Sequence, residues 1–99
     1  MDRITTTIKR EWLQEIAAGR KRVEFREIKP YWIRRLSKTE PPFELRLING
    51  MRSKAPELTV IVQRVRKNSR AGIFELHLGK VVEVRHWDVK GGRPLTTSG

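Results

Sequence analysis

Three ionic side chains near the start of the chain have types and spacing that suit chemistry: Lys21, Glu24 and Arg26. Side chains two positions apart on an extended strand point the same way, so Glu24 and Arg26 are expected on one face. Flanking cations keep a carboxylate ionised and can hold a phosphate or a polarised carbonyl, while the carboxylate can take a proton. Spacing alone, however, favours ordinary surface ion pairs.

An amphipathic helix is predicted directly before these residues. Apolar residues recur at helical spacing from Ile8 to Ala17, with charged residues on the opposite side. This register places Trp12 in the core. Gly19 is expected to end the helix, because glycine readily adopts the left-handed conformation that closes helices. Lys21 then lies directly before the next predicted element.

That next element is a strand, predicted from the alternation of residues 22–27. Its apolar residues, Val23 and Phe25, are expected to face a core, opposite to the ionic pair. A proline then ends the strand and favours a short helical turn over residues 31–36. Tyr31 is thereby left near the strand end, where it joins the three ionic side chains as a candidate catalytic residue.

Strand patterns recur along the rest of the chain. They cover residues 3–7, 43–48, 58–65, 73–78 and 80–87. Gly79 marks a bulge or tight bend between the last two, and Asn49-Gly50 opens a longer loop. Five or six short strands with one early helix indicate an α+β fold, a small curved β-barrel whose helix covers one end.

The length of 99 residues suits a single domain, and with 37% hydrophobic and 33% charged residues its core is expected to be small. The domain is assigned to residues 1–87. The Gly, Pro, Ser and Thr content that follows predicts a flexible C-terminal tail over residues 88–99. A monomer is favoured.

Net charge is the strongest global feature: 22 Lys and Arg against 11 Asp and Glu give +11. Such a field attracts polyanions, so RNA, DNA and anionic membranes are the candidate partners. No run approaches the roughly 18 apolar residues that a membrane span needs, which leaves nucleic acid as the leading partner. The chain has no cysteine, which excludes disulfides and thiolate chemistry and fits a cytoplasmic protein.

Basic and amide side chains in loops and at strand ends are the candidate nucleic-acid contacts. They are Arg20, Arg22, Asn49, Arg52, Lys54, Lys67 and Arg70. Three aromatic residues are candidates for stacking on an unpaired base: Tyr31, Trp32 and Trp87. For any one basic loop residue, a merely solvated side chain is about as good an interpretation.

Metal and cofactor chemistry finds no support in the sequence. His77 and His86 match no metal-ligand spacing, and neither belongs to a recognisable nucleophilic triad. The glycines have neither dinucleotide nor nucleotide-triphosphate spacing. We therefore expect no cofactor and no metal.

The pattern Gly19-x-Lys21-x-x-Glu24-x-Arg26, between a helix and a strand, resembles the G-x-K-x-x-E-x-R signature of the ASCH domain, a branch of the PUA-like superfamily. Other segments also resemble the small ASCH proteins of phages and bacteria: residues 27–32, 48–50, 55–56 and 74–80. The resemblance covers nearly all of the chain before Asp88. It implies a PUA-like β-barrel, a cleft beside the first helix that holds the motif side chains, and an RNA or nucleoside ligand.

Members of this family differ in activity: some hydrolyse N4-acetylcytidine, at least one kind cleaves single-stranded RNA, and many are presumed RNA binders. The amidohydrolases carry a threonine nucleophile at the position of Glu24 and a further carboxylate from a late insertion. Here the corresponding connection, residues 67–72, is short and has no acid. These differences argue against deacetylation by that mechanism, although Lys21 is in place.

Three functions follow as hypotheses. The first is a module that binds RNA or a nucleotide, or a weak ribonuclease acting on single-stranded RNA. The second is a hydrolase of a modified nucleoside in the same cleft. The third is a phage accessory protein whose basic surface engages an acidic host protein. Whether the chain is an enzyme stays open at this stage.

Overall fold

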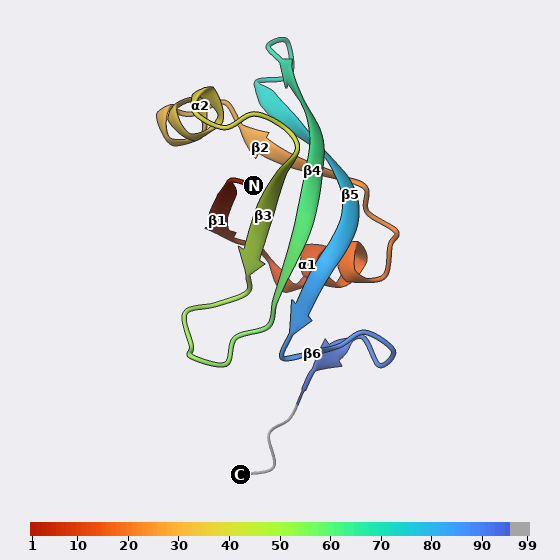
Figure 1. The fold of residues 1–99 in the computed structure, drawn as a ribbon. Helices are drawn as coiled ribbons and strands as arrows, with labels where there is room; N and C mark the ends of the chain where they lie inside the picture. The colour runs from red at the N-terminus through yellow and green to blue at the C-terminus, as the bar shows by residue number, and fades with distance from the viewer. Residues whose placement is uncertain (96–99) are drawn as a thin grey trace.

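The computed structural model describes residues 1–95 and shows an α+β fold (Figure 1). The elements are β1 (Arg3–Thr7), α1 (Arg10–Ala17), β2 (Val23–Glu27), α2 (Pro30–Ser37), β3 (Phe43–Ile48), β4 (Glu57–Asn68), β5 (Ile73–Arg85), β6 (Trp87–Asp88) and β7 (Arg93–Pro94). Five strands form one sheet in the order β1-β3-β4-β5-β2, and β6 pairs with β7. In this sheet β1 and β3 are parallel, whereas the other neighbours are antiparallel.

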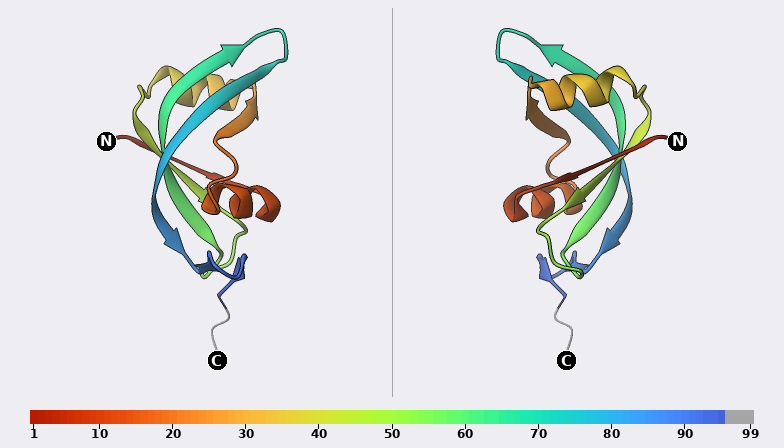
Figure 2. Two further views of the ribbon diagram at one scale, coloured as in Figure 1. Left: turned by 90° about the vertical axis from the view of Figure 1, so that its right-hand side faces the viewer. Right: turned by 90° about the vertical axis from the view of Figure 1, so that its left-hand side faces the viewer.

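The sheet curls into a half-barrel around one side of the molecule. Figure 2 shows β4 and β5 bending around this inner side, where α1 and β2 lie. The edge strands β1 and β2 therefore come round towards each other, with α2 near one end of the opening and α1 near the other (Figure 1). The α+β class and the curved sheet agree with the sequence-based prediction.

The core fills this inner side. Alternate residues of β3, β4 and β5 point inwards, as predicted, and helix residues complete the cluster. Its fully or nearly fully buried members include Phe43, Leu45, Leu47, Leu58, Val60, Val62, Leu76, Leu13 and Ile16. Each large apolar side chain contributes about 1.5–3 kcal/mol when it leaves water. This core therefore holds the half-barrel together.

Gly79 lies within β5, so the two strands predicted on either side of it are one strand. The pairing of β4 with β5 shifts register around this point, for example between Val60 and Val62, which agrees with the predicted bulge. A Cβ atom at Gly79 would lie 2.6 Å from the Gln63 side chain. The absence of a Cβ atom at Gly79 therefore lets the Gln63 side chain of β4 pack closely against β5 at the bulge.

A second buried acid, Glu57, lies at the start of β4 and is 7% exposed. Its Oε2 accepts a hydrogen bond from Arg46 Nε at 2.7 Å, and its Oε1 lies 3.6 Å from Arg85. The hydrogen bond to this carboxylate raises the pKa of Arg46. The buried carboxylate of Glu57 is therefore compensated by two cations, Arg46 and Arg85.

The segment after β5 forms a short hairpin in the described part of the chain. Trp87, which was predicted to end a strand, is 5% exposed and pairs with Pro94 in the short hairpin of β6 and β7. The chain enters this hairpin through His86, whose φ is 59°. Residues 96–99 of the predicted tail lie outside the described residues. Within residues 1–95, no helix is long and apolar enough to cross a membrane.

Candidate ligand-binding cleft

The position of β2 at the sheet edge explains where its ionic side chains point. Glu24 lies opposite Leu76 of β5, and Arg26 lies opposite Phe74. Because Leu76 and Phe74 belong to the core, directly opposite side chains on β2 point to the same inner side. Glu24 is accordingly 4% exposed. The prediction that Glu24 and Arg26 share one face is confirmed, and that face is the inner one.

The prediction for the two apolar residues of β2 was wrong. Phe25 is 52% exposed and Val23 is only half-buried. The alternation was identified correctly, but the two faces were assigned the wrong way round. Since α1 lies on the inner side of the sheet (Figure 2), the opposite face of β2 is left open to solvent. A buried carboxylate on the inner face is tolerated because it is paired.

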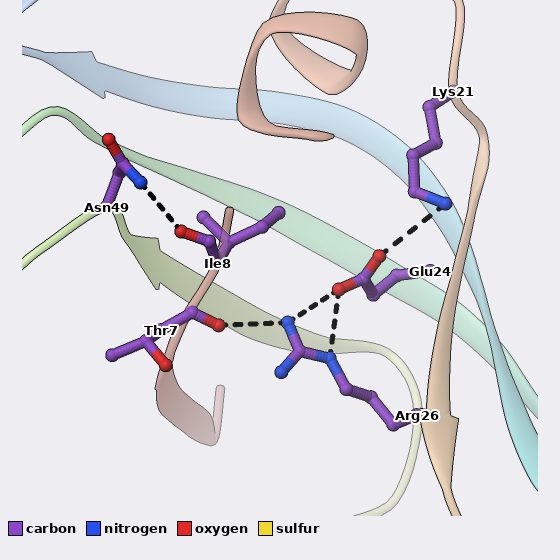
Figure 3. Close-up of polar contacts among 6 residues, drawn as sticks. All are labelled: Thr7, Ile8, Lys21, Glu24, Arg26 and Asn49. Atoms are coloured by element: carbon purple, nitrogen blue, oxygen red, sulfur yellow. Dashed lines mark hydrogen bonds and ion pairs between the residues drawn. The ribbon is translucent and has the colours of Figure 1, made fainter. Parts of the chain in front are cut away.

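Glu24 is held by cations on both of its oxygens, as Figure 3 shows. Arg26 donates to Oε2 through Nε at 2.9 Å and also through Nη2. Lys21 Nζ lies 3.6 Å from Oε1. The side chains of Lys21 and Arg26 are only 15% and 18% exposed. The arrangement is therefore largely shielded from water, unlike the surface ion pairs that spacing alone favours.

Arg26 also connects the two edges of the half-barrel. Its Nη2 donates a 3.0 Å hydrogen bond to the carbonyl oxygen of Thr7, the last residue of β1 (Figure 3). β1 and β2 are not paired with each other in the sheet. A side chain thus bridges the opening between the edges and fixes Glu24 beside it.

Lys21 sits between two exposed aromatic rings. Its Nζ lies 5.0 Å from the ring centre of Trp12 and 4.9 Å from that of Phe25. Both distances suit cation–π attraction. An ammonium group has three donors, and at 3.6 Å its contact with Glu24 is an ion pair longer than a hydrogen bond. Lys21 consequently retains donors for a ligand oxygen.

Trp12 was expected in the core but is 43% exposed. Leu13 and Ile16 fill the space beneath α1, and they are 0% and 2% exposed. Trp12 lies one residue before Leu13, about 100° around the helix, at the edge of the apolar face. Helical spacing identified this face correctly but placed its boundary one residue too far.

An open cleft of about 880 Å³ surrounds these side chains. Its lining residues come from the end of β1, α1, β2, the start of α2 and the loop after β3: Thr7, Ile8, Lys9, Trp12, Lys21, Glu24, Phe25, Arg26, Glu27, Lys29, Trp32 and Asn49. The volume is within the usual range of small-molecule sites. Aromatic rings beside convergent charged groups suit a planar, polar ligand.

Asn49 fixes one wall of the cleft. Its Nδ2 donates to the carbonyl oxygen of Ile8 at 2.9 Å, and its Oδ1 accepts from Arg10 Nε at 3.0 Å. Both partners are about forty positions away along the chain. Asn49 was predicted as a nucleic-acid contact, and it lines the cleft while holding β1 and α1 in place.

The aromatic residues predicted to stack on a base differ in their position and exposure. Trp32 and Trp87 are buried, which contradicts the predicted stacking role for them. Arg26 Cζ lies 5.4 Å from the Trp32 ring, so Trp32 supports the site from beneath. Tyr31 is 46% exposed and contacts Trp32 edge-to-face, but it is not among the residues that line the cleft.

The remaining basic candidates are distributed over the surface. Arg20 pairs with Glu15 beside the end of α1, and Arg22 lines a small hollow next to Gly79. Lys67 and the nearby Arg70 lie in and just after the last residues of β4, at the tip of the long hairpin. Arg52 and Lys54 line a separate groove. The structure therefore gathers Lys21, Glu24, Arg26 and Asn49, but not these six.

Sequence reasoning missed Phe25, Trp12, Lys9 and Lys29 as residues lining the cleft. Phe25 could have been found from its place in the sequence, because it is an aromatic residue directly between Glu24 and Arg26. Within residues 1–95, no group of three or more His, Cys, Asp or Glu side chains is arranged to hold a metal ion. Comparisons with protein-family models, with curated proteins and with solved structures find no match for the chain.

Proposed function

We propose that the protein binds single-stranded RNA or a nucleotide, and that the cleft receives one unpaired base. The observation that carries this proposal is the position of Lys21, which lies between the exposed rings of Trp12 and Phe25 and beside the buried carboxylate of Glu24. Bases that are not paired bind proteins by stacking on aromatic rings and by hydrogen bonds along their edges. The cleft supplies both kinds of contact.

Each group has a definite part in this binding mode. The base stacks on the exposed part of the Trp12 or Phe25 ring, beside the Lys21 ammonium group. Lys21 donates to a base carbonyl or a phosphate oxygen, and Glu24 Oε1 accepts from an exocyclic amino group. Arg26 holds Glu24 through Oε2, and Oε1, whose only described contact is the 3.6 Å ion pair with Lys21, can accept from the ligand. The net charge of +11 raises the local concentration of RNA.

The resemblance to the ASCH domain supports this proposal, and with it we propose a PUA-like fold. The half-barrel, the helix before the motif and the positive φ of 79° at Gly19 are all compatible with that family. The motif's Lys21, Glu24 and Arg26 share one cleft beside α1, which is where the resemblance implies a ligand.

Binding accounts for the geometry better than proton transfer by Glu24 does. Its Oε2 already accepts two hydrogen bonds from Arg26 and its Oε1 lies 3.6 Å from Lys21 Nζ, so a proton on either oxygen would weaken the contacts that hold the side chain. We therefore place Glu24 in ligand orientation.

Hydrolysis of a modified nucleoside is a second candidate function, because Lys21 is shielded from water in the same cleft as Glu24. Incubation with N4-acetylcytidine, followed by chromatography for cytidine, tests it. Release of cytidine that disappears in Lys21→Gln supports hydrolysis. No release from the unmodified protein contradicts it.

The direct test of the binding proposal is a titration of fluorescein-labelled single-stranded RNA followed by anisotropy. The variant is Lys21→Gln, and the matched control is Lys80→Gln, which removes the same charge from an exposed position outside the cleft. We expect Lys21→Gln to weaken binding about tenfold or more, in line with the loss of a charged hydrogen bond. Equal affinity of the two variants would contradict the proposal.

A further inference from the structure

A second groove of about 870 Å³ adjoins the cleft. It is formed by the loop between β3 and β4, the first residue of α1, and residues near the C-terminal hairpin. Its lining residues are Arg10, Asn49, Gly50, Met51, Arg52, Ser53, Lys54, Ala55, Pro56, His86, Pro94 and Leu95. In Figure 1 this loop and β6 lie at the same end of the molecule, opposite α2.

The groove combines basic side chains with apolar surface. Arg10, Arg52 and Lys54 supply its cationic side chains, His86 adds an imidazole, and none of its described lining residues is acidic. Within residues 1–95, no carboxylate lies within 4.0 Å of the charged atoms of Arg52 or Lys54, although most of the fold's acids are paired with cations. Unpaired cations in a hollow attract an anion strongly, and phosphate is the anion that suits them.

Two details hold this groove in shape. Arg10 is oriented by its hydrogen bond from Nε to Asn49 Oδ1 at 3.0 Å, which leaves its Nη groups available. His86 has a φ of 59°, an uncommon conformation for a residue with a side chain. The carbonyl oxygen of His86 accepts from Leu95 N at 3.2 Å, which extends the pairing of β6 with β7 to these two groove residues.

Asn49 connects the groove with the cleft, because it lines both. Its two side-chain atoms are bonded to Ile8 in the cleft wall and to Arg10 in the groove wall. A nucleic-acid strand that leaves the cleft over Asn49 therefore enters the groove directly. The hairpin tip with Lys67 and Arg70 lines neither hollow.

We propose that this groove binds the phosphate backbone next to the base that occupies the cleft. The inference rests on the proposed function. It narrows the ligand class to a single-stranded oligonucleotide, whose backbone continues from the base in the cleft into the adjoining groove. Arg52 and Lys54 contact phosphate oxygens, while the cleft contacts the base.

The experiment uses a random-sequence RNA hexanucleotide with a fluorescein label and measures affinity over a range of salt concentrations. The test variant is Arg52→Gln/Lys54→Gln. The matched control is Arg34→Gln/Lys38→Gln, which removes one arginine and one lysine from exposed positions at the end of α2, outside both hollows. Trp12→Ala is the cleft variant, and uridine 5′-monophosphate serves as a competitor.

We expect the groove variant to weaken hexanucleotide binding about tenfold at low salt and to reduce the slope of log K against log salt concentration by about 1.4, from roughly 0.7 for each single-strand phosphate contact. The control variant should stay within about twofold of the unmodified protein. Competition by the mononucleotide should need much higher concentrations than competition by the unlabelled hexanucleotide.

The outcomes separate the two proposals. Loss of affinity in Trp12→Ala alone overturns the groove assignment and leaves the cleft proposal standing. Loss in the groove variant alone supports the groove and overturns the cleft as the base site. Equal losses in the groove and control variants overturn the groove assignment, because they indicate a diffuse cationic field. A mononucleotide that binds as tightly as the hexanucleotide also overturns it.

Discussion

The cleft and the groove have nearly the same size, about 880 and 870 Å³, but they hold their charges in opposite ways. In the cleft a buried carboxylate is enclosed by two cations that are themselves shielded, and aromatic rings flank them. In the groove the loop cations are exposed and, among the described residues, have no carboxylate partner. The first arrangement suits recognition of a base, and the second suits contact with phosphates of any sequence.

The largest expected effect concerns the stability of the cleft. Glu24→Gln leaves Arg26 and Lys21 without their counter-charge inside a shielded site. We expect a loss of about 2–3 kcal/mol in the free energy of unfolding, below the ~3–5 of fully buried pairs because both cations keep some exposure. Urea denaturation measures this loss.

Glu57→Gln is the matched control for Glu24→Gln, because Glu57 is also a buried acid held by two cations. It should cost a comparable amount of stability and leave the affinity for RNA unchanged. If both variants lose RNA affinity equally at temperatures where they are folded, the special role of the cleft carboxylate is refuted.

The second effect concerns the base contact. Trp12→Ala should weaken binding of single-stranded RNA by about 1–3 kcal/mol, which is the usual contribution of one stacked base. The slope of affinity against salt concentration should stay the same, because no phosphate contact is lost. A changed slope of affinity against salt concentration, with little loss of affinity at low salt, would instead indicate that Trp12 lies beside the phosphate backbone of the RNA.

The third effect concerns the bridge between the sheet edges. Arg26→Lys keeps the charge but cannot reproduce two bonds to Glu24 together with the bond to Thr7. We expect a loss of about 1 kcal/mol in unfolding free energy and a several-fold weaker affinity for RNA. Unchanged stability would show that the bridge contributes nothing to closing the half-barrel.

The smallest effect is expected in the groove, on stability. Arg52→Gln changes an exposed loop side chain without a described ion-pair partner, so unfolding free energy should change by less than about 0.5 kcal/mol. Thermal unfolding followed by circular dichroism measures the difference. A loss of about 2 kcal/mol would mean that the groove, like the cleft, is held by buried charge.

Much of the fold was predictable because the pattern of apolar residues is local. Alternation identified the inward residues of β3 to β5, and Gly19 and Pro30 correctly marked a helix end and a helix start. The strand boundary at Gly79 was less predictable. A bulge bends β5 without ending it, and the difference depends on how β4 follows the bend.

The candidate site was predictable only in part, for a physical reason. Alternation in β2 shows that Glu24 and Phe25 lie on opposite faces, but not which face a helix covers. Apolar preference favours burying Phe25, and tertiary structure reverses that choice because Lys21 and Arg26 compensate the buried acid. The contacts of Asn49 with distant backbone could not be read from local sequence at all.

The central claim is that an unpaired base stacks on Trp12, and tryptophan fluorescence tests it most directly. Trp12 is 43% exposed, whereas Trp32 and Trp87 are 6% and 5% exposed, so quenching by a bound base should come from Trp12. Titration with an RNA hexanucleotide should quench the unmodified protein in a saturable way. In Trp12→Phe binding should persist, as anisotropy shows, while the quenching disappears. Equal quenching in Trp12→Phe, or RNA binding without any quenching of the unmodified protein, would contradict the account.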